Sequence, residues 1–320
     1  MRTCVTGCNG FVGSHLAEFL LAHGATVYGL RRSWRSSMDN VAHLGDRVRW
    51  LDADLTDAHA VESALRVAAP DVIFHLAAHS YVQSSWAQPA ATFAVNLIGT
   101  SHLLEAARRR EPMPRIIFAS SSEAYGRVEP EELPITEDQP LRPLSPYAVS
   151  KAAADYACYQ AWRSYGLPVV RLRVFNCEGP RRGEVFMPSN FAKQIAAGAA
   201  SGAEPVLVHV GNLDAVRDLT DVRDVVRAYW LAAERGEPGE VYNIASGVGY
   251  SAERVLDMLA EIAGVRVMRR YDPTRYRPSD VPRLVGDASK AKRDLGWEAT
   301  IPIGTTLRDL YAYWRERVGR

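Results

Sequence analysis

The chain has 320 residues, of which 47% are hydrophobic and 23% charged, with a formal net charge of +1. These values are typical of a soluble globular protein of one or two domains without long disordered tails, and the near-neutral charge gives no reason to expect a nucleic acid as partner. No apolar run approaches the roughly 18 residues of a membrane span, so we expect a cytoplasmic protein with no membrane partner.

Short β-branched segments alternate with helical patterns through the first half of the chain, which begins with a strand and shows no signal region. Apolar spacing predicts helices over residues 11–23, 61–68, 90–109 and 148–165. The strand-like segments are RTCVT, TVYGL, VRWL, VIFHL, RIIFA and VVRLRV. Such alternation implies right-handed crossovers and a parallel sheet covered on both faces. The predicted fold class is therefore α/β, doubly wound.

The turn from the first strand into the first helix, VTGCNGFVG, is rich in glycine. Glycine there allows a tight turn, a close approach of backbone N–H groups to a pyrophosphate, and close packing of the helix on the strand. Its position at the first strand and first helix makes the signal stronger than three glycines alone would be. The residues expected to bind a dinucleotide cofactor are Gly7, Gly10, Phe11, Val12 and Gly13.

The second strand ends in VYGLRRSWR, which places Arg31 and Arg32 where an NAD enzyme usually has Asp or Glu. An acidic residue would bond the ribose hydroxyls, whereas arginine offers a planar charged fork to an added phosphate. The pair favours NADP over NAD as the cofactor. The alternative is that both are solvated loop residues of an arginine-rich chain.

Two later segments follow the third and fourth strands, where folds of this class bind ligands. Asp54 and Leu55 are candidates to receive the adenine edge. HLAAHS carries small residues that let the backbone approach the nicotinamide half. The residues expected to contact the cofactor there are Leu76, Ala77, Ala78 and Ser80.

The segment SPYAVSK contains one of only four lysines, at 151, 193, 290 and 292. If Pro146 opens a helix, Tyr147 and Lys151 lie one turn apart on the same face. A lysine ammonium near a phenol favours the phenolate, so it would lower the pKa of Tyr147 towards that of a general base. Lys151 can also hold the nicotinamide ribose.

The segment SSSEAYG follows the fifth strand and supplies hydroxyl groups. Ser121 is our candidate to hydrogen-bond the reacting oxygen. Glu123, two residues on, would point to the same side of an extended segment and add a second acid/base group. Serine clusters are usually loop filler, and it is the Tyr147/Lys151 pair that makes this one a candidate.

After Asn176 the character changes to loops rich in Gly, Pro and Arg around shorter helices. We expect residues 1–175 and about 214–246 to form a Rossmann-type domain, with VYNIA (241–245) returning to the main sheet. A smaller lobe would contain about 176–213 and 247–320, with TLRDLYAYWRERV as an amphipathic helix packed on it. The four cysteines show neither metal-type pairs nor disulfide density, so we expect buried reduced thiols and no metal.

Taken together, TGCNGFVG, HLAAHS, SSSEAYG and SPYAVSK resemble the extended short-chain dehydrogenase/reductase family that acts on nucleotide sugars. The likeness runs over nearly the whole chain. It implies that Ser121, Tyr147 and Lys151 form a triad moving hydride between carbon 4 of the sugar and the cofactor. It also implies that the chain forms a homodimer or homotetramer through the helices at 90–109 and 148–165.

Three C-terminal segments, FNCEGPRRGEVF, VGNLDAVRD and YRPSDVPRLVGDASKAKRDLGW, resemble GDP-mannose 4,6-dehydratases and GDP-4-keto-6-deoxymannose reductases. The resemblance implies a GDP-hexose substrate and places Arg182 beside the cofactor. A diphosphate favours cationic partners. The implied substrate-binding residues are Ser80, Ser122, Asn176, Lys193, Asn212, Arg217, Arg277 and Asp280.

The choice between these two enzymes depends on few residues. A dehydratase must also remove the proton from carbon 5 and the hydroxyl from carbon 6, and Glu123 is placed to serve as acid and base. The reductases also carry this Glu, so it does not decide between the two enzymes. GPRRGE and the paired arginines resemble the dehydratases, whereas Phe11, Val12 and PSNFAKQIAAG depart from them. We predict a dehydratase, with the reductase as the alternative.

Two other classes stay open. A sugar 4-epimerase usually has no carboxylate at the position of Glu123 and prefers NAD. A cofactor-sensing regulator on the same fold tends to lose the catalytic Tyr or Lys, and this chain has both.

Overall fold

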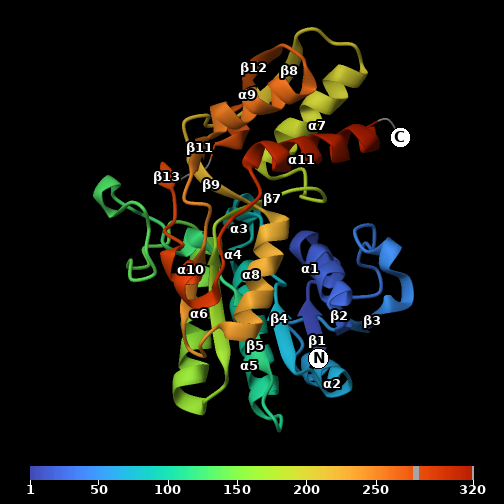
Figure 1. The fold of residues 1–320 in the computed structure, drawn as a ribbon, viewed down its shortest axis with the longest axis vertical. Helices are drawn as coiled ribbons and strands as arrows, with labels where there is room; N and C mark the ends of the chain where they lie inside the picture. Colours follow the sequence, from blue (N-terminus) through green and yellow to red (C-terminus); the bar gives the residue numbers. More distant parts are fainter. Residues whose placement is uncertain (277–280, 319–320) are drawn as a thin grey trace.

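A seven-stranded parallel sheet forms the centre of the protein in a computed structural model that describes residues 1–276 and 281–318 (Figure 1). Its strand order is β10-β6-β5-β4-β1-β2-β3. The strands are β1 (Arg2–Thr6), β2 (Thr26–Arg31), β3 (Val48–Asp52), β4 (Val72–His75), β5 (Arg115–Ala119), β6 (Val169–Val174) and β10 (Val241–Ile244). Because β10 pairs in parallel with β6, the VYNIA segment returns to the main sheet as predicted.

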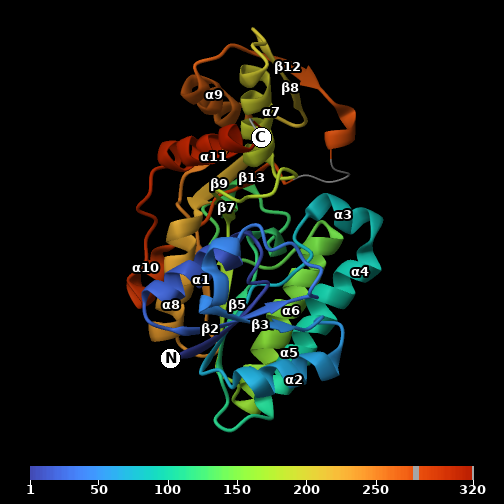
Figure 2. The same ribbon diagram turned by 90° about the vertical axis from the view of Figure 1, so that its right-hand side faces the viewer.

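Helices cover both faces of this sheet (Figure 2). One face carries α1 (Phe11–Ala22), α8 (Val222–Arg235) and α10 (Ser289–Leu295), and the other carries α2 (Ala58–Ala68), α5 (Gly99–Arg108) and α6 (Pro146–Tyr165). Phe74 packs towards the first set and Ile73 towards the second. Strands buried on both faces read as continuous apolar runs, and all four residues of β4 are buried. The doubly wound α/β prediction is confirmed.

The predicted helix at 90–109 is interrupted. It consists of α4 (Pro89–Phe93), a π-helical turn η2 (Ala94–Ile98) and α5, with α3 (Val82–Ala87) preceding them. Turns of π-helix occur often at functional sites. Here the turn contains Asn96, which is buried. The short 3-10 helices are η1 (Ala42–Arg47), η3 (Ser122–Ala124), η4 (Pro130–Glu132) and η5 (Pro273–Arg275).

A smaller lobe lies beyond the carboxyl ends of the central strands (Figure 1). Its helices are α7 (Met187–Ala200), α9 (Ala252–Ala263) and α11 (Ile303–Val318). Its strands are β7 (Asn176–Glu178), β8 (Val206–Val210), β9 (Val216–Asp221), β11 (Gly249–Ser251), β12 (Val267–Tyr271) and β13 (Arg283–Leu284). The predicted amphipathic helix is α11, which packs against α7. The exact domain boundaries stay a prediction.

The state of the cysteines and the character of the helices can be compared with what the sequence predicts. All four cysteines are buried free thiols. Across residues 1–276 and 281–318, no helix combines the length and the apolar character that crossing a bilayer requires. The same residues contain no cluster of three or more His, Cys, Asp or Glu that could hold a metal ion.

A buried ion-pair network joins α6 to β6 beneath the loop that follows β5. The Asp155 carboxylate accepts hydrogen bonds from Arg171 at 2.8 Å, from Arg173 at 3.2 Å and from the Ser120 hydroxyl at 2.6 Å. Burial raises the pKa of Asp155, but the guanidinium groups of Arg173 and Arg171 outweigh burial and hold it below its usual value. The network therefore anchors Ser120, the neighbour of Ser121.

Replacing this carboxylate should destabilise the fold. We expect Asp155→Asn to lower the free energy of unfolding by about 3–5 kcal/mol, because it leaves two buried guanidinium groups without their counter-charge. Urea denaturation measures the change. Glu105→Gln is the control, since Glu105 pairs with Arg108 on the exposed surface of α5 and should matter little. Similar losses in both variants would contradict this account of Asp155.

Candidate active site

The strand order of the main sheet reverses between β1 and β4, because the chain runs outward from β1 to β3 before β4 returns to the other side of β1. Crevices outside the carboxyl ends of strands at such a point bind ligands. Gly7 follows β1 with φ +67°, and a Cβ on it would lie 3.0 Å from the Cα of Ala77, which follows β4. The two loops therefore meet at the switch point.

The glycine loop fits a dinucleotide pyrophosphate. Gly10 is the N-cap of α1, and no side chain caps this helix. A Cβ on Gly13 would lie 2.2 Å from the carbonyl oxygen of Gly7. The bare backbone leaves the first N–H groups of α1, at Phe11 and Val12, available to an anion at the positive end of the helix dipole. These five residues would hold the pyrophosphate.

Arg31 and Arg32, for which the sequence predicts the same role, have different surroundings in the structure. Arg31 Nε donates to Asp52 at 2.7 Å, and its guanidinium lies 6.0 Å from the Trp50 ring. Arg32 is exposed. The pKa of Asp54 is lowered, against the effect of burial, by hydrogen bonds from Thr56 and by the charge of Arg32. Arg32 is thus the better placed of the two to meet a ligand.

Hydrogen bonds to the Thr6 side chain fix the backbone of the loop after β4. The Thr6 hydroxyl accepts hydrogen bonds from the backbone N–H groups of Leu76 at 3.1 Å and Ala77 at 3.0 Å, and it is hydrogen-bonded to His75 at 2.8 Å. Burial lowers the pKa of His75 to about 3, so this histidine is neutral. The backbone of the candidates Leu76 and Ala77 is therefore held by Thr6, with Ser80 exposed beyond them.

The predicted triad is brought together. Ser145 caps α6 by accepting from the N–H of Ala148 at 3.1 Å, and Pro146 occupies the first turn as predicted. Tyr147 is buried, and its hydroxyl is hydrogen-bonded to Ser121. Lys151 follows one turn later on α6.

The pKa values of Tyr147 and Lys151 are shifted in a way that the sequence did not predict. Burial raises the pKa of Tyr147 to about 12, although the hydrogen bond to Ser121 opposes this rise. Lys151 Nζ donates to the backbone oxygen of Ala119 and lies 4.5 Å from the Phe118 ring. Burial lowers the pKa of Lys151 to about 8. The prediction that Lys151 lowers the pKa of Tyr147 is therefore wrong for the protein alone, because desolvation of the phenol dominates.

The segment carrying Glu123 is not extended as predicted. Ser122–Ala124 form the 3-10 helix η3, and the Ser121 hydroxyl caps it by accepting from the N–H of Glu123 at 3.2 Å. Ser122 is buried. The charge of Glu123 still acts on the phenol, because it contributes to the raised pKa of Tyr147. A tight turn, rather than strand alternation, brings Glu123 to the triad.

Sequence reasoning missed Asn96, which links the loop after β4 to the triad helix. Its amide oxygen accepts from the N–H of His79 at 2.8 Å, and its nitrogen donates to the oxygen of His79 at 3.1 Å and to the Ser150 hydroxyl at 2.9 Å. Ser150 in turn donates to the carbonyl of Tyr147 at 2.7 Å. A lone asparagine in the apolar run ATFAVNLIG was the available signal.

Arg182 lies near the glycine loop, and its contact with the cofactor stays a prediction. Its guanidinium is 3.4 Å from the ring of Phe186 and 5.2 Å from that of Phe11. Phe186 also meets Tyr81 edge-on, with ring centroids 5.9 Å apart. Sequence reasoning missed Phe186 and Tyr81, because only the fold brings these segments to the glycine loop.

The structure gives the predicted substrate residues separate contacts and does not test whether they form one site. Lys193 forms an ion pair with Glu184, and Arg217 Nη1 donates to the carbonyl of Val281 at 2.8 Å. Asn212 accepts from the N–H of Asp214 at 3.0 Å, and Asn176 begins β7. The set stays a prediction, and two of its members lie outside the described residues, namely Arg277 and Asp280.

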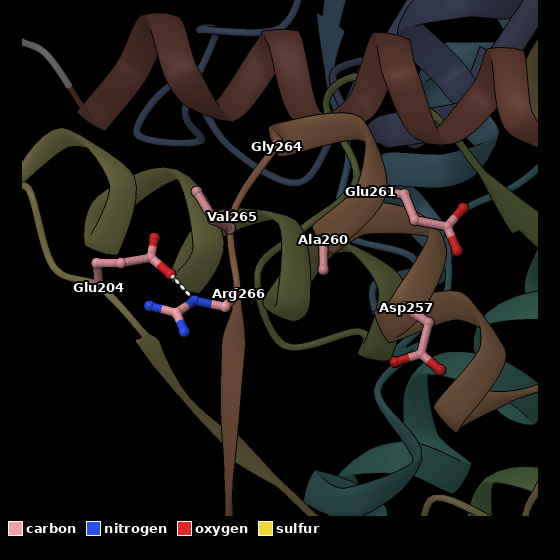
Figure 3. Close-up of a pocket in the computed structure, with 7 residues that line it drawn as sticks. All are labelled: Glu204, Asp257, Ala260, Glu261, Gly264, Val265 and Arg266. Atoms are coloured by element: carbon pink, nitrogen blue, oxygen red, sulfur yellow. Dashed lines mark hydrogen bonds and ion pairs between the residues drawn. The ribbon is translucent and has the colours of Figure 1, made fainter.

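A separate surface pocket of about 730 Å³ lies in the smaller lobe (Figure 3). Arg266 donates to Glu204 across it at 2.7 Å. Its lining residues are Glu204, Asp257, Ala260, Glu261, Gly264, Val265 and Arg266. None of them is a candidate site residue, so the pocket is not part of the active site.

Comparison with known proteins places this site in context. The family model described as GDP-mannose 4,6 dehydratase matches residues 4–310. GDP-6-deoxy-D-mannose reductase of Pseudomonas aeruginosa is 34% identical, over 99% of this chain and 98% of its own. GDP-mannose 4,6-dehydratase of Vibrio cholerae is 35% identical, over 96% of this chain and 92% of its own.

Solved structures share the whole fold. UDP-glucose 4-epimerase of Thermotoga maritima, with UDP-glucose, matches with a TM-score of 0.89 and 31% identity, over 99% of this chain and 100% of its own. RMD of Pseudomonas aeruginosa, complexed with NADPH, matches with a TM-score of 0.84 and 31% identity, over 99% and 100%. The chain therefore belongs to the GDP-mannose 4,6 dehydratase family, among the extended short-chain dehydrogenase/reductase enzymes that act on nucleotide sugars.

Proposed function

We propose that the protein is an NADP-dependent GDP-mannose 4,6-dehydratase, which converts GDP-mannose to GDP-4-keto-6-deoxymannose. The observation that carries the proposal is the position of Glu123 in the turn capped by the Ser121 hydroxyl, which is itself hydrogen-bonded to Tyr147. Oxidation at carbon 4 alone needs the triad, whereas loss of water from carbons 5 and 6 needs a further acid/base group. Glu123 supplies that group.

The side chains would divide the work as follows. A nicotinamide cofactor held by the glycine loop and Lys151 would supply a reversible hydride acceptor for the change at carbon 4 and the reduction at carbon 6. Tyr147 takes the proton of the carbon 4 hydroxyl, and Ser121 hydrogen-bonds the same oxygen as it becomes a carbonyl. Glu123 removes the proton from carbon 5 and protonates the departing hydroxyl of carbon 6, which leaves as water. Carbon 5 then takes up a proton as carbon 6 is reduced, and this proton balances the one that Tyr147 took from the carbon 4 hydroxyl. Lys151, buried beneath the cleft, holds the nicotinamide ribose.

The reductase is the second candidate, and two observations favour it. The Pseudomonas aeruginosa reductase is as similar to this chain as the dehydratases are. Phe11 in the glycine loop departs from the dehydratase pattern, and its ring packs against Arg182. In a reductase Tyr147 would give a proton to the carbon 4 oxygen, and Glu123 would only bind the sugar.

We also propose that the chain assembles as a homodimer or homotetramer through α4 to α6. On α6, Val149, Tyr156, Tyr159 and Tyr165 have between 41% and 59% of their surface exposed. An apolar face of this kind is typical of an interface between copies.

A single incubation tests the function. GDP-mannose with catalytic NADP and no reductant should lose one water, seen by mass spectrometry, without net consumption of cofactor. A reductase would instead leave GDP-mannose unchanged and oxidise NADPH when given GDP-4-keto-6-deoxymannose. That second result would overturn the dehydratase proposal.

Glu123→Gln should slow the loss of water by about 10²–10⁴-fold, which is the usual contribution of an acid/base group. Cofactor affinity should be unchanged, because the residue acts on the sugar. Glu131→Gln, an exposed carboxylate on η4, is the control and should have full activity. Normal dehydration by Glu123→Gln would remove this residue from the mechanism.

Arg32→Ala should weaken NADP binding by about 10–100-fold while leaving NAD binding nearly unchanged, since hydrogen bonds to charged groups contribute roughly 1.5–3 kcal/mol. Arg31→Ala should change the NADP/NAD preference less, because Arg31 is already engaged by Asp52. Fluorescence titration with both cofactors measures the four affinities. Equal affinity of the wild type for NADP and NAD, with neither variant altering it, would contradict the NADP assignment.

A further inference from the structure

Glu178, the last residue of β7, has no role in the reaction described above. It is 1% exposed, and its Oε2 atom has no hydrogen-bond partner among the described residues. The Nε atom of Arg182 is also buried and lacks a hydrogen bond within the same part of the chain. Arg182 Nε and Glu178 Oε1 lie 3.7 Å apart, which is an ion pair longer than a hydrogen bond.

The aromatic neighbours of Arg182 do not fix the rotation of its guanidinium group. Phe186 and Phe11 contact the guanidinium at 3.4 and 5.2 Å from their ring centroids. A ring packed against a guanidinium restrains its plane but not its rotation within that plane. A charged group at the edge of the guanidinium, on the Nε side, is needed to set that rotation. Glu178 is in that position.

The backbone around Arg182 is anchored independently of Glu178. Arg181 adopts φ +72°, and its side chain donates to Glu18 at 2.6 Å and to Ser14 at 3.2 Å on α1. His15, also on α1, donates to the carbonyl of Pro180 at 3.0 Å. The segment would therefore stay on α1 if Glu178 were replaced, so that a change at Glu178 acts on the Arg182 side chain.

We propose that Glu178 is a positioning residue for cofactor binding, which orients Arg182 so that its remaining N–H groups meet the anionic part of the dinucleotide at the glycine loop. The inference rests on the proposed cofactor role of Arg182. Burial raises the pKa of Glu178 to about 7, and the charge of Arg182 opposes this rise. The carboxylate therefore depends on Arg182 for its own ionisation, as a dedicated partner would.

A double-mutant cycle on the full chain tests this role. The dissociation constant for NADP is measured by fluorescence titration for the wild type, Glu178→Gln, Arg182→Ala and the double variant. We expect Glu178→Gln to weaken binding about fivefold or more in the wild type and to have no further effect beside Arg182→Ala. Glu204→Gln, at the surface pair with Arg266 in the same lobe, should bind NADP normally.

Several outcomes would overturn the proposal. Unchanged or tighter binding by Glu178→Gln would do so, and so would an equal loss in both backgrounds, which a merely structural role produces. If Glu178→Gln does not fold, Glu178→Met serves in the same cycle, because an apolar side chain of similar length buries no polar atom of its own. Failure of the wild type to convert GDP-mannose overturns the proposed function, whereas additive losses overturn only the role of Glu178.

Discussion

The burial of a parallel sheet on both faces is the constraint on which the rest of the structure depends. Parallel neighbours cannot be joined by tight turns, so each connection crosses a face of the sheet and the carboxyl ends gather at one edge. The strand order reverses between β1 and β4 at that edge, which is where folds of this class bind ligands. The glycine loop, the loop after β4 and the turn with Ser121 meet there although they are far apart in sequence.

Burial also sets the chemistry of the cleft. It raises the pKa of Tyr147 to about 12 and lowers that of Lys151 to about 8, so each group is pushed towards its neutral form. Buried hydrogen bonds behind these groups keep the segments that carry them in place. Asp155 anchors Ser120 below Ser121, and Asn96 links the loop after β4 to the helix of Tyr147. The triad candidates are thus held in place by buried residues behind them, an arrangement that rigid sites require.

The family contains both dehydratases and reductases, and the features that separate them are local. A sheet and triad of this kind could serve oxidation and reduction at carbon 4 alike, because the two reactions are the reverse of one another. Dehydration adds only one requirement, an acid/base group beside the triad. In this chain Glu123, in the turn η3, is the candidate for that group, and Arg182 packs between Phe11 and Phe186 at the glycine loop.

The sequence by itself determined the features that depend on local spacing. Alternating periods predicted the doubly wound fold, which is confirmed. The glycines after β1 and the Tyr–Lys pair lie where local spacing placed them, at the starts of α1 and α6, while their cofactor and catalytic roles stay predictions. Tertiary structure alone decided whatever depends on distant partners. Asp52 engages Arg31 and leaves Arg32 exposed, and Glu178 meets Arg182 through a turn of the chain. Desolvation of Tyr147 reverses the pKa shift expected from its lysine neighbour, because burial is a property of the whole fold that no local pattern contains.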